Sequence, residues 1–245
     1  LSIQYCLEDS SISVKQIDYI VFYDKPFLKF ERLLETYLAF APKGFKSFYV
    51  SIPIWIKNKL FQKSILIKEL CKLLGNEINW KEKLLFSDHH MSHASSAFFP
   101  SPFKRSAILT LDGVGEWTTT SISTGIDNKI IFQKELHFPH SLGLLYSAFT
   151  FYSGFKVNSG EYKLMGLAPY GSPIYSDIIK EKIIKIANDG SFKLDMSYFD
   201  FATGLKMTSK KFHSLFNGPP RKSESKITQK EMDIAASIQK ITEEI

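Results

Sequence analysis

The chain has 245 residues, of which 44% are hydrophobic and 23% charged, so a folded core is expected and wholesale disorder is excluded. The formal net charge is +6, but the basic residues are scattered and cluster only in pairs such as Lys104-Arg105 and Lys210-Lys211. A nucleic-acid-binding face would concentrate them, so we expect no nucleic-acid partner. The chain opens on Leu1 and closes in a helical pattern without a stop signal, so we interpret it as part of a longer protein.

No apolar run approaches the roughly 20 residues that a membrane-spanning helix needs. The most apolar stretch, residues 48–56, is short and is followed by Lys57 and Lys59, so we expect no membrane partner. The two cysteines, Cys6 and Cys71, lie outside any CxxC motif. This argues against a disulfide scaffold and is typical of a protein in a reducing cytoplasm.

The first third of the chain predicts helices between two short strands. Residues 2–8 have the pattern of a helix end, and the β-branched and aromatic content of residues 18–23 predicts a buried strand. Helical periodicity runs through residues 26–74. A second strand is expected over residues 83–87, directly before a run of histidines.

The remaining two thirds predict a helix, three strands and a series of further helices. Asp88 is the expected N-cap of the first helix, and Ala94, Ala97 and Phe98 are its expected packing face. The other elements are a strand over 106–111, a hairpin of strands 117–124 and 129–136 around 125–128, helices over 142–153, 161–168 and 173–187, a loop over 206–225, and an amphipathic helix over 227–245.

Two histidines, His89 and His93, form the sharpest chemical motif of the sequence. Residues four apart share one face of a helix, so both imidazoles can reach one metal ion. Imidazole suits iron and zinc alike. An HExxH protease site is excluded, because position 90 is His90. Two alternatives stay open: both residues cap or pack the helix, or His90 pairs with His93.

A glycine turn follows the strand over 106–111, with the sequence Asp112-Gly113-Val114-Gly115-Glu116. Glycines let backbone N–H groups approach a phosphate closely, so the turn predicts phosphate binding. Asp112 can also bind a metal directly or through water. The alternatives are an ordinary turn and an Asp112 side chain that satisfies the turn's own amides.

Alternating strands and helices predict an α/β domain. A strand, a DG-x-G turn and a second strand resemble the phosphate loop of the actin-like ATPase superfamily (ASKHA, ribonuclease H-like). The expected fold is therefore part of an actin-like ATPase domain over residues 1–245.

Four segments in the same order and at similar spacing resemble the NodU/CmcH carbamoyltransferases, which modify hydroxyl groups of antibiotics and nodulation factors. The similarity extends over nearly the whole chain. The segments are DHHMSHASSA from Asp88, LDGVGEW from Leu111, HSLGLLY from His140 and GEYKLMGLAPYG from Gly160.

The resemblance implies a cytoplasmic enzyme with two domains. A C-terminal domain makes carbamoyl adenylate from ATP and carbamoyl phosphate. The N-terminal ASKHA domain, similar to tRNA threonylcarbamoyl transferases, transfers the carbamoyl group to a hydroxyl of a small-molecule, sugar or antibiotic-like acceptor. Residues 1–245 match only part of that first domain, without its opening β-hairpin and its later metal-binding Asp. We therefore expect the adenylate-forming domain of the same chain as a partner, with a homodimer as an open alternative, and no turnover by this part alone.

The resemblance also implies roles for the turn and the histidines. His89 and His93 would bind a divalent metal, with Fe(II) preferred, and Asp112 would be a third ligand. Asp112, Gly113, Val114 and Gly115 would face the phosphate of the adenylate, and Glu116 would give polar support. A metal held in this way can act as a Lewis acid. The base that deprotonates the acceptor is expected outside this chain, so we name no catalytic residue.

Three further residues would contact the adenylate. Ser141 and Gly143 open a predicted helix, so their amides can face a nucleotide, although an ordinary N-cap at Ser141 explains the residue equally well. Lys163 can neutralise a phosphate, and Glu161 can bind the acceptor or pair with Lys163. A surface salt bridge is an equally good explanation for both.

Other functions remain as alternatives. A different ASKHA enzyme, either a sugar kinase or a tRNA threonylcarbamoyl transferase, would share the fold, but a kinase would not need the paired histidines. A non-catalytic binding relative would have no need to keep His89, His93, Asp112 and Gly113.

Overall fold

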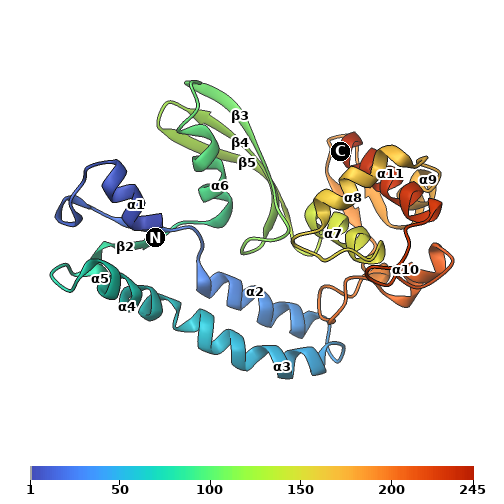
Figure 1. The fold of residues 1–245 in the computed structure, drawn as a ribbon, viewed down its shortest axis with the longest axis horizontal. Helices are drawn as coiled ribbons and strands as arrows, with labels where there is room; N and C mark the ends of the chain where they lie inside the picture. Colours follow the sequence, from blue (N-terminus) through green and yellow to red (C-terminus); the bar gives the residue numbers. More distant parts are fainter. Residues whose placement is uncertain (1) are drawn as a thin grey trace.

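The computed structural model describes residues 2–245, apart from the side chains of residues 58 and 59. It is a mixed α/β structure with three parts (Figure 1). A long helical arm lies along one side, a three-stranded sheet with one helix against it stands at the centre, and a helical lobe contains the C-terminus.

The N-terminal segment ends in a short strand, which pairs in parallel with a second short strand from after the helical arm. After α1 (Ser2–Asp9) and the 3-10 turn η1 (Val14–Gln16), β1 (Ile20–Phe22) pairs in parallel with β2 (Leu84–Phe86). Their apolar side chains pack against Leu70 and Trp80. The prediction of a fully buried strand is wrong, because Val21 is 59% exposed on the uncovered face of the pair.

The helical arm confirms the periodicity predicted for residues 26–74. It contains α2 (Pro26–Ala39), α3 (Phe45–Trp55), the π-helix η2 (Ile56–Leu60) and α4 (Gln62–Leu74). A short helix, α5 (Trp80–Lys83), then leads into β2.

The far end of the arm contacts the lobe through the turn between α2 and α3. Gly44 has a φ of +83° there, and a Cβ on it would lie 2.5 Å from the Cβ of Thr203. The Ser47 hydroxyl donates a hydrogen bond to the backbone oxygen of Thr203. Only glycine fits at this turn, both for its φ and for the close approach.

The central sheet is antiparallel, with strand order β3-β4-β5. Its strands are β3 (Arg105–Leu111), β4 (Thr118–Ile126) and β5 (Lys129–His137). The hairpin is tighter than predicted, because only Asp127 and Asn128 connect β4 to β5. Asp127 has a φ of +51°, a conformation that Asp and Asn tolerate better than other side chains.

Helix α6 (His89–Phe98) lies against one face of this sheet (Figure 1). Its buried residues are His90, Ala94 and Phe98, which recur every four positions as one helical face requires. Phe98 fits against Gly125 of β4, where a Cβ would lie 2.5 Å from the Phe98 ring. The predicted packing face is thus correct for Ala94 and Phe98 and wrong for Ala97, which is exposed.

The lobe holds the largest apolar core, formed around Leu145, Phe149, Phe212, Phe216 and Ile238. Its elements are α7 (Leu142–Tyr152), α8 (Glu161–Leu167), η3 (Ala168–Tyr170), α9 (Ser176–Lys182), β6 (Ile184–Ile186), β7 (Phe192–Leu194), η4 (Met196–Tyr198), α10 (Lys210–Leu215) and α11 (Gln229–Glu244).

Two predictions for this lobe need correction. The helix expected over 173–187 is shorter, because residues 184–186 form β6 and pair with β7. The loop expected over 206–225 contains α10. Both cysteines are free, with Cys6 exposed and Cys71 partly buried. Among the described residues, no helix combines the length and the hydropathy that crossing a bilayer requires.

Candidate metal centre

The first turns of α6 and the end of β3 bring together three side chains of the types that bind metals. His89 and His93 lie one helical turn apart, and their Nε2 atoms are 3.1 Å from each other. Asp112 follows the last residue of β3, and its Oδ2 lies 2.9 Å from His89 Nε2. One donor atom from each of the three residues lies within 4.8 Å of the others.

The two separations that involve His89 fit a common metal ion. Two ligands at about 2.1 Å from a metal lie about 3 Å apart when they meet at a right angle, and slightly farther at a tetrahedral angle. The 2.9 Å and 3.1 Å separations agree with this geometry. Two imidazoles and one carboxylate form a donor set that suits iron and zinc. His93 is exposed, so further ligands can approach from that side.

The carboxylate of Asp112 is held in its ionised form. The hydrogen bond from His89 lowers the pKa of Asp112 to about 2, against the effect of burial, and the backbone N–H of Gly113 contributes a second hydrogen bond at 2.6 Å. Hydrogen bonds to a charged carboxylate favour that charged form. Asp112 thus satisfies an amide of its own turn and also faces the histidines.

His90 does not join the cluster. It points to the sheet, where its Nδ1 lies 2.8 Å from Ser121 Oγ, and burial lowers its pKa. The His90 and His93 rings are 6.2 Å apart, against 4.7 Å for His89 and His93. Of the two candidate histidine pairs, the structure therefore brings together His89 and His93.

Glu116 supports the cluster through the backbone. Its buried carboxylate accepts the N–H of His89 at 3.0 Å through Oε2 and the N–H of Lys25 at 2.8 Å through Oε1. These are the first residue of α6 and the residue before α2. One carboxylate therefore fastens the beginnings of two helices beside the metal-binding side chains.

The predicted N-cap of α6 is confirmed in its position. Asp88 occupies the N-cap position, but its side chain makes no capping hydrogen bond. Instead its Oδ1 lies 2.7 Å from Lys25 Nζ. The exposed N–H of His89 is satisfied by Glu116, which is distant in the sequence, so capping rules for neighbouring residues do not reveal it.

The two glycines of the turn differ in their surroundings. A Cβ on Gly115 would lie 2.9 Å from the Cβ of His89, so this position must stay small for the imidazole to fit. A Cβ on Gly113 would find its nearest neighbour at 3.9 Å, in Leu144. Val114 between them is half-buried. The absence of a side chain at Gly115 thus leaves room for the His89 imidazole, whereas Gly113 borders open space.

Ser141 and Gly143 hold the turn against α7. Ser141 is the N-cap of α7: its Oγ accepts the Leu144 N–H at 3.0 Å and donates to the Gly113 carbonyl at 2.6 Å. A Cβ on Gly143 would lie 2.7 Å from the Asp112 carbonyl oxygen. The ordinary N-cap interpretation of Ser141 is confirmed, and both residues contact the backbone of the predicted phosphate turn.

Lys163 and Glu161 lie on α8 and do not pair with each other in the described part of the chain. Lys163 is exposed. Glu161 accepts hydrogen bonds from Ser147 Oγ at 2.8 Å and from the backbone of Asn158 and Gly160 at 2.9 and 3.1 Å. Glu161 therefore orders the loop before its own helix.

Sequence reasoning missed Arg32, on α2. Its side chain is buried, and its guanidinium lies over the Phe138 ring, 5.2 Å from the centroid. Asp112 and Glu116 both act on its charge. In the sequence it lies among the apolar residues of a helix, and nothing in that pattern marks it as part of a site.

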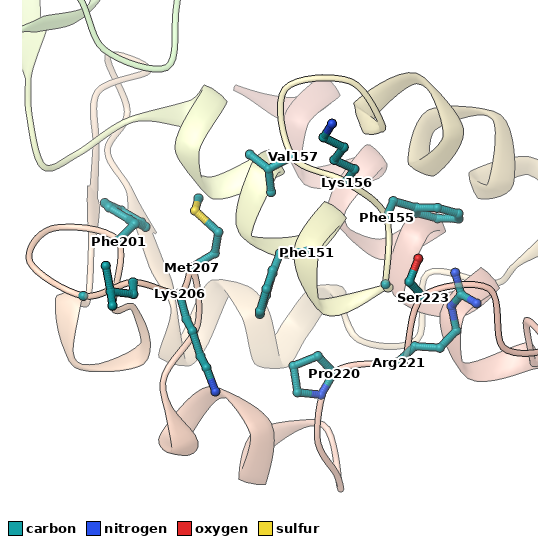
Figure 2. Close-up of a pocket in the computed structure, with 13 residues that line it drawn as sticks. Phe151, Phe155, Lys156, Val157, Phe201, Lys206, Met207, Pro220, Arg221 and Ser223 are labelled. Atoms are coloured by element: carbon teal, nitrogen blue, oxygen red, sulfur yellow. The ribbon is translucent and has the colours of Figure 1, made fainter. Parts of the chain in front are cut away.

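A separate cavity of about 770 Å³ lies in the lobe (Figure 2). Phe151, Phe201 and Met207 contribute apolar walls, and none of the metal-binding residues lines it. Figure 2 shows the side chains of Lys156 and Lys206 extending to opposite sides. The cations of this cavity do not converge on one point, in contrast to the three donors of the metal cluster.

The whole chain, residues 1–245, matches the protein family described as carbamoyltransferase N-terminus. An uncharacterised protein of Synechocystis sp. is 58% identical over 243 residues, which cover 99% of this chain and 40% of that protein. Nodulation protein NolNO of Sinorhizobium fredii is 31% identical over 247 residues, which cover 100% of this chain and 32% of that protein. The chain thus spans less than half the length of these relatives.

Proposed function

Since this chain belongs to the family of carbamoyltransferase N-terminal regions, we propose that it is the metal-binding part of an O-carbamoyltransferase. The resemblance expected from its four segments is confirmed by that membership and by the similarity to NolNO. The observation that carries the proposal is the cluster of His89, His93 and Asp112, whose donor atoms lie within 4.8 Å of one another.

The proposed reaction transfers a carbamoyl group from carbamoyl adenylate to a hydroxyl group. The acceptor oxygen forms a bond to the carbamoyl carbon, the bond from that carbon to the AMP oxygen breaks, and AMP leaves. A base takes the hydroxyl proton. A metal bound at the cluster would supply positive charge to an oxygen of the carbamoyl or phosphate group. Two imidazoles and one carboxylate bind Fe(II) or Zn(II), so the donor set is compatible with Fe(II), the metal that the family resemblance favours.

The turn after β3 is the proposed phosphate-binding element. Its two glycine amides are already used, because Gly113 N–H donates to Asp112 Oδ1 and Gly115 N–H donates to the Thr118 carbonyl at 3.1 Å. In the described residues, the amides of Val114 and Glu116 form no hydrogen bond within the protein. We therefore propose these two amides as the donors to the phosphate, with Ser141 and Gly143 holding the turn in place.

The strand, turn and strand of β3 and β4 also support an actin-like ATPase fold as the parent architecture. In that arrangement the phosphate of the adenylate would meet the turn, and Lys163 would approach from α8. The hydroxyl acceptor and the supply of carbamoyl adenylate, from ATP and carbamoyl phosphate in a further domain of the same chain, belong to the same proposal. The acceptor, the supply of carbamoyl adenylate and a cytoplasmic location are proposed from the family and not from the contacts described above.

The proposal is tested by metal analysis of the complete parent protein, purified without oxygen. We expect about one iron per chain, lost in His89→Ala and in His93→Ala. His137→Ala is the matched control, since His137 is an exposed histidine of β5 beside Glu135 and should leave the metal content unchanged. A wild-type protein without metal would refute the metal-assisted mechanism. Loss of metal in the control would show that the effect is not specific to the cluster.

Activity gives the second test. With ATP, carbamoyl phosphate and a panel of hydroxylated acceptors, the metal-loaded protein should release AMP in proportion to the carbamoylated product. Asp112→Asn should lower this rate, because it removes the charge of one ligand. AMP release that is independent of any acceptor would instead indicate hydrolysis and would count against transfer.

A further inference from the structure

Arg32 is a buried cation that pairs with no carboxylate of the described residues. Only 9% of the residue is exposed, and its Nη1 atom is fully buried with no hydrogen-bond partner. In the described part of the chain, its guanidinium forms no ion pair with a carboxylate. Burying an unpaired charge is costly, because water is lost and nothing replaces it. Such a group calls for a partner that the described residues do not supply.

The neighbouring cations of α2 make the contrast clear. Lys25, Lys29 and Arg32 follow the spacing of one helical face. Lys25 pairs with Asp88 at 2.7 Å, and Lys29 pairs with the buried Asp24 at 2.5 Å. The first two cations are therefore paired with carboxylates, and of the three only Arg32 forms no direct ion pair with the described residues.

The carboxylates near Arg32 are already engaged. Asp112 is bonded to His89 and to the Gly113 amide, and Glu116 accepts two backbone N–H groups. Both act on Arg32 through space, which keeps the guanidinium charged although burial lowers its pKa to about 10. Phe138, over whose ring the guanidinium lies, donates its backbone N–H to the Trp117 carbonyl at 2.8 Å, and this places Arg32 close to the turn that carries Asp112 and Glu116.

Its position is fixed from two sides. Glu116 fastens the beginning of α2 to the beginning of α6, and the Phe138 ring lies under the guanidinium at 5.2 Å. The guanidinium is planar, so its N–H groups lie in one plane. That planar fork matches two oxygens of a phosphate or carboxylate, and less rotamer entropy is lost on binding than for a free side chain.

We propose that Arg32 is an oxyanion-binding residue of the metal centre, which receives the phosphoryl group of the ligand beside Asp112. The identity of that phosphoryl group, the AMP part of carbamoyl adenylate, rests on the proposed function. The assignment of Arg32 itself rests on its burial, its lack of an ion pair among the described residues and its place close to the turn that carries Asp112.

Equilibrium binding of AMP and of adenosine to the complete parent protein tests this inference, because the two probes differ only by the phosphate. We expect Arg32→Met to weaken AMP binding by about tenfold or more and to leave adenosine binding unchanged. Arg32→Lys keeps a charge without the fork and should fall between. Arg105→Met is the matched control, since Arg105 is an exposed arginine of β3 and should bind both probes as the wild type does.

Rescue separates binding from a packing role against Phe138. In an Arg32→Ala protein, added ethylguanidinium should restore AMP binding and have no effect on adenosine binding. If Arg32→Met does not fold, Arg32→Lys carries the comparison. Equal AMP affinity in wild type and variants, an equal loss for both probes, or no AMP binding by the wild type would each overturn the inference.

The outcomes for this residue and for the proposed function are distinguishable. The AMP measurements are made on chelator-treated protein as well as on metal-loaded protein. Phosphate-dependent binding through Arg32 in a wild-type protein that purifies without metal would sustain the inference and refute the metal-assisted mechanism. If the protein binds metal but its affinity for AMP does not depend on Arg32, the metal-assisted mechanism is sustained and the inference about Arg32 is refuted.

Discussion

Glu116 accepts the backbone N–H of His89 at 3.0 Å, although the two residues are 27 positions apart. The same carboxylate accepts the N–H of Lys25 at 2.8 Å. A residue that touches neither histidine ring therefore determines where the helix that carries both rings begins. We therefore expect the cluster of His89, His93 and Asp112 to depend on Glu116 as well as on its own three side chains.

Replacement of Glu116 should affect stability and metal binding together. Glu116→Gln keeps one acceptor and turns an amide N–H₂ group toward the second backbone N–H, so one buried donor is left unpaired. We expect a loss of about 1–3 kcal/mol in the free energy of unfolding, and metal affinity lower by about 10–100-fold. Denaturant titration and metal competition measure the two effects. Glu135→Gln, an exposed carboxylate beside His137, serves as the control.

The two glycines of the turn should respond differently to the same change. Gly115→Ala places a Cβ at 2.9 Å from the Cβ of His89 and should displace the imidazole. Gly113→Ala meets nothing closer than 3.9 Å. We expect metal content to fall in the first variant and to persist in the second, with both proteins folded. Equal metal content in the two would show that the close contact at Gly115 has no bearing on the site.

Removal of the Ser141 hydroxyl should loosen the phosphate turn from α7. Ser141→Ala leaves the Leu144 N–H and the Gly113 carbonyl without their partner. The expected loss in unfolding free energy is about 1–2 kcal/mol, with weaker AMP binding. Ser209→Ala removes the N-cap of α10 and is the comparison, because it should cost stability without changing AMP affinity. Thermal unfolding and calorimetry read out both properties.

Glu161 should make stability depend on pH. Burial raises its pKa, but hydrogen bonds from Asn158, Ser147 and Gly160 outweigh that effect and lower the pKa below 4.5. A carboxyl group with a lowered pKa in the folded state stabilises the fold above its unfolded pKa, and this contribution is lost as the pH falls through the folded pKa. Glu161→Gln should therefore be less stable than wild type at neutral pH, and the difference should shrink below pH 4.5. A difference that is constant with pH would contradict this assignment.

The sequence predicted what depends on local spacing. The interval between His89 and His93 places both rings on one helical face, and the glycine turn after β3 brings Asp112 to them. Glu116 was expected to give polar support, but its hydrogen bonds to the starts of α2 and α6 and the burial of Arg32 were not predictable. Both depend on how α2, α6 and the turn meet in three dimensions, and neither residue type nor spacing carries that information.

The missed elements of the lobe have local causes. Phe212 of α10 and Phe216, directly after the helix, are buried and four residues apart, but lysine, histidine and serine around them conceal the apolar face. The hairpin of β6 and β7 turns at Gly190, whose φ is +80°. Asp189-Gly190 is a common turn signal, but the residues before it continue a helical pattern, and the expected helix therefore included residues 184–186.

The two faces of α6 have different roles: one face packs against the sheet, and the other carries the two histidines of the cluster. His90 and Phe98 are buried against the sheet, and His89 and His93 face Asp112. A single residue inserted between β2 and α6 would turn the helix by about 100°. The packing and the ligands would then be lost in the same step. The connection of Ser87 and Asp88 should consequently tolerate many substitutions but no change of length, and a homologue with a longer connection would need a different way to hold its metal.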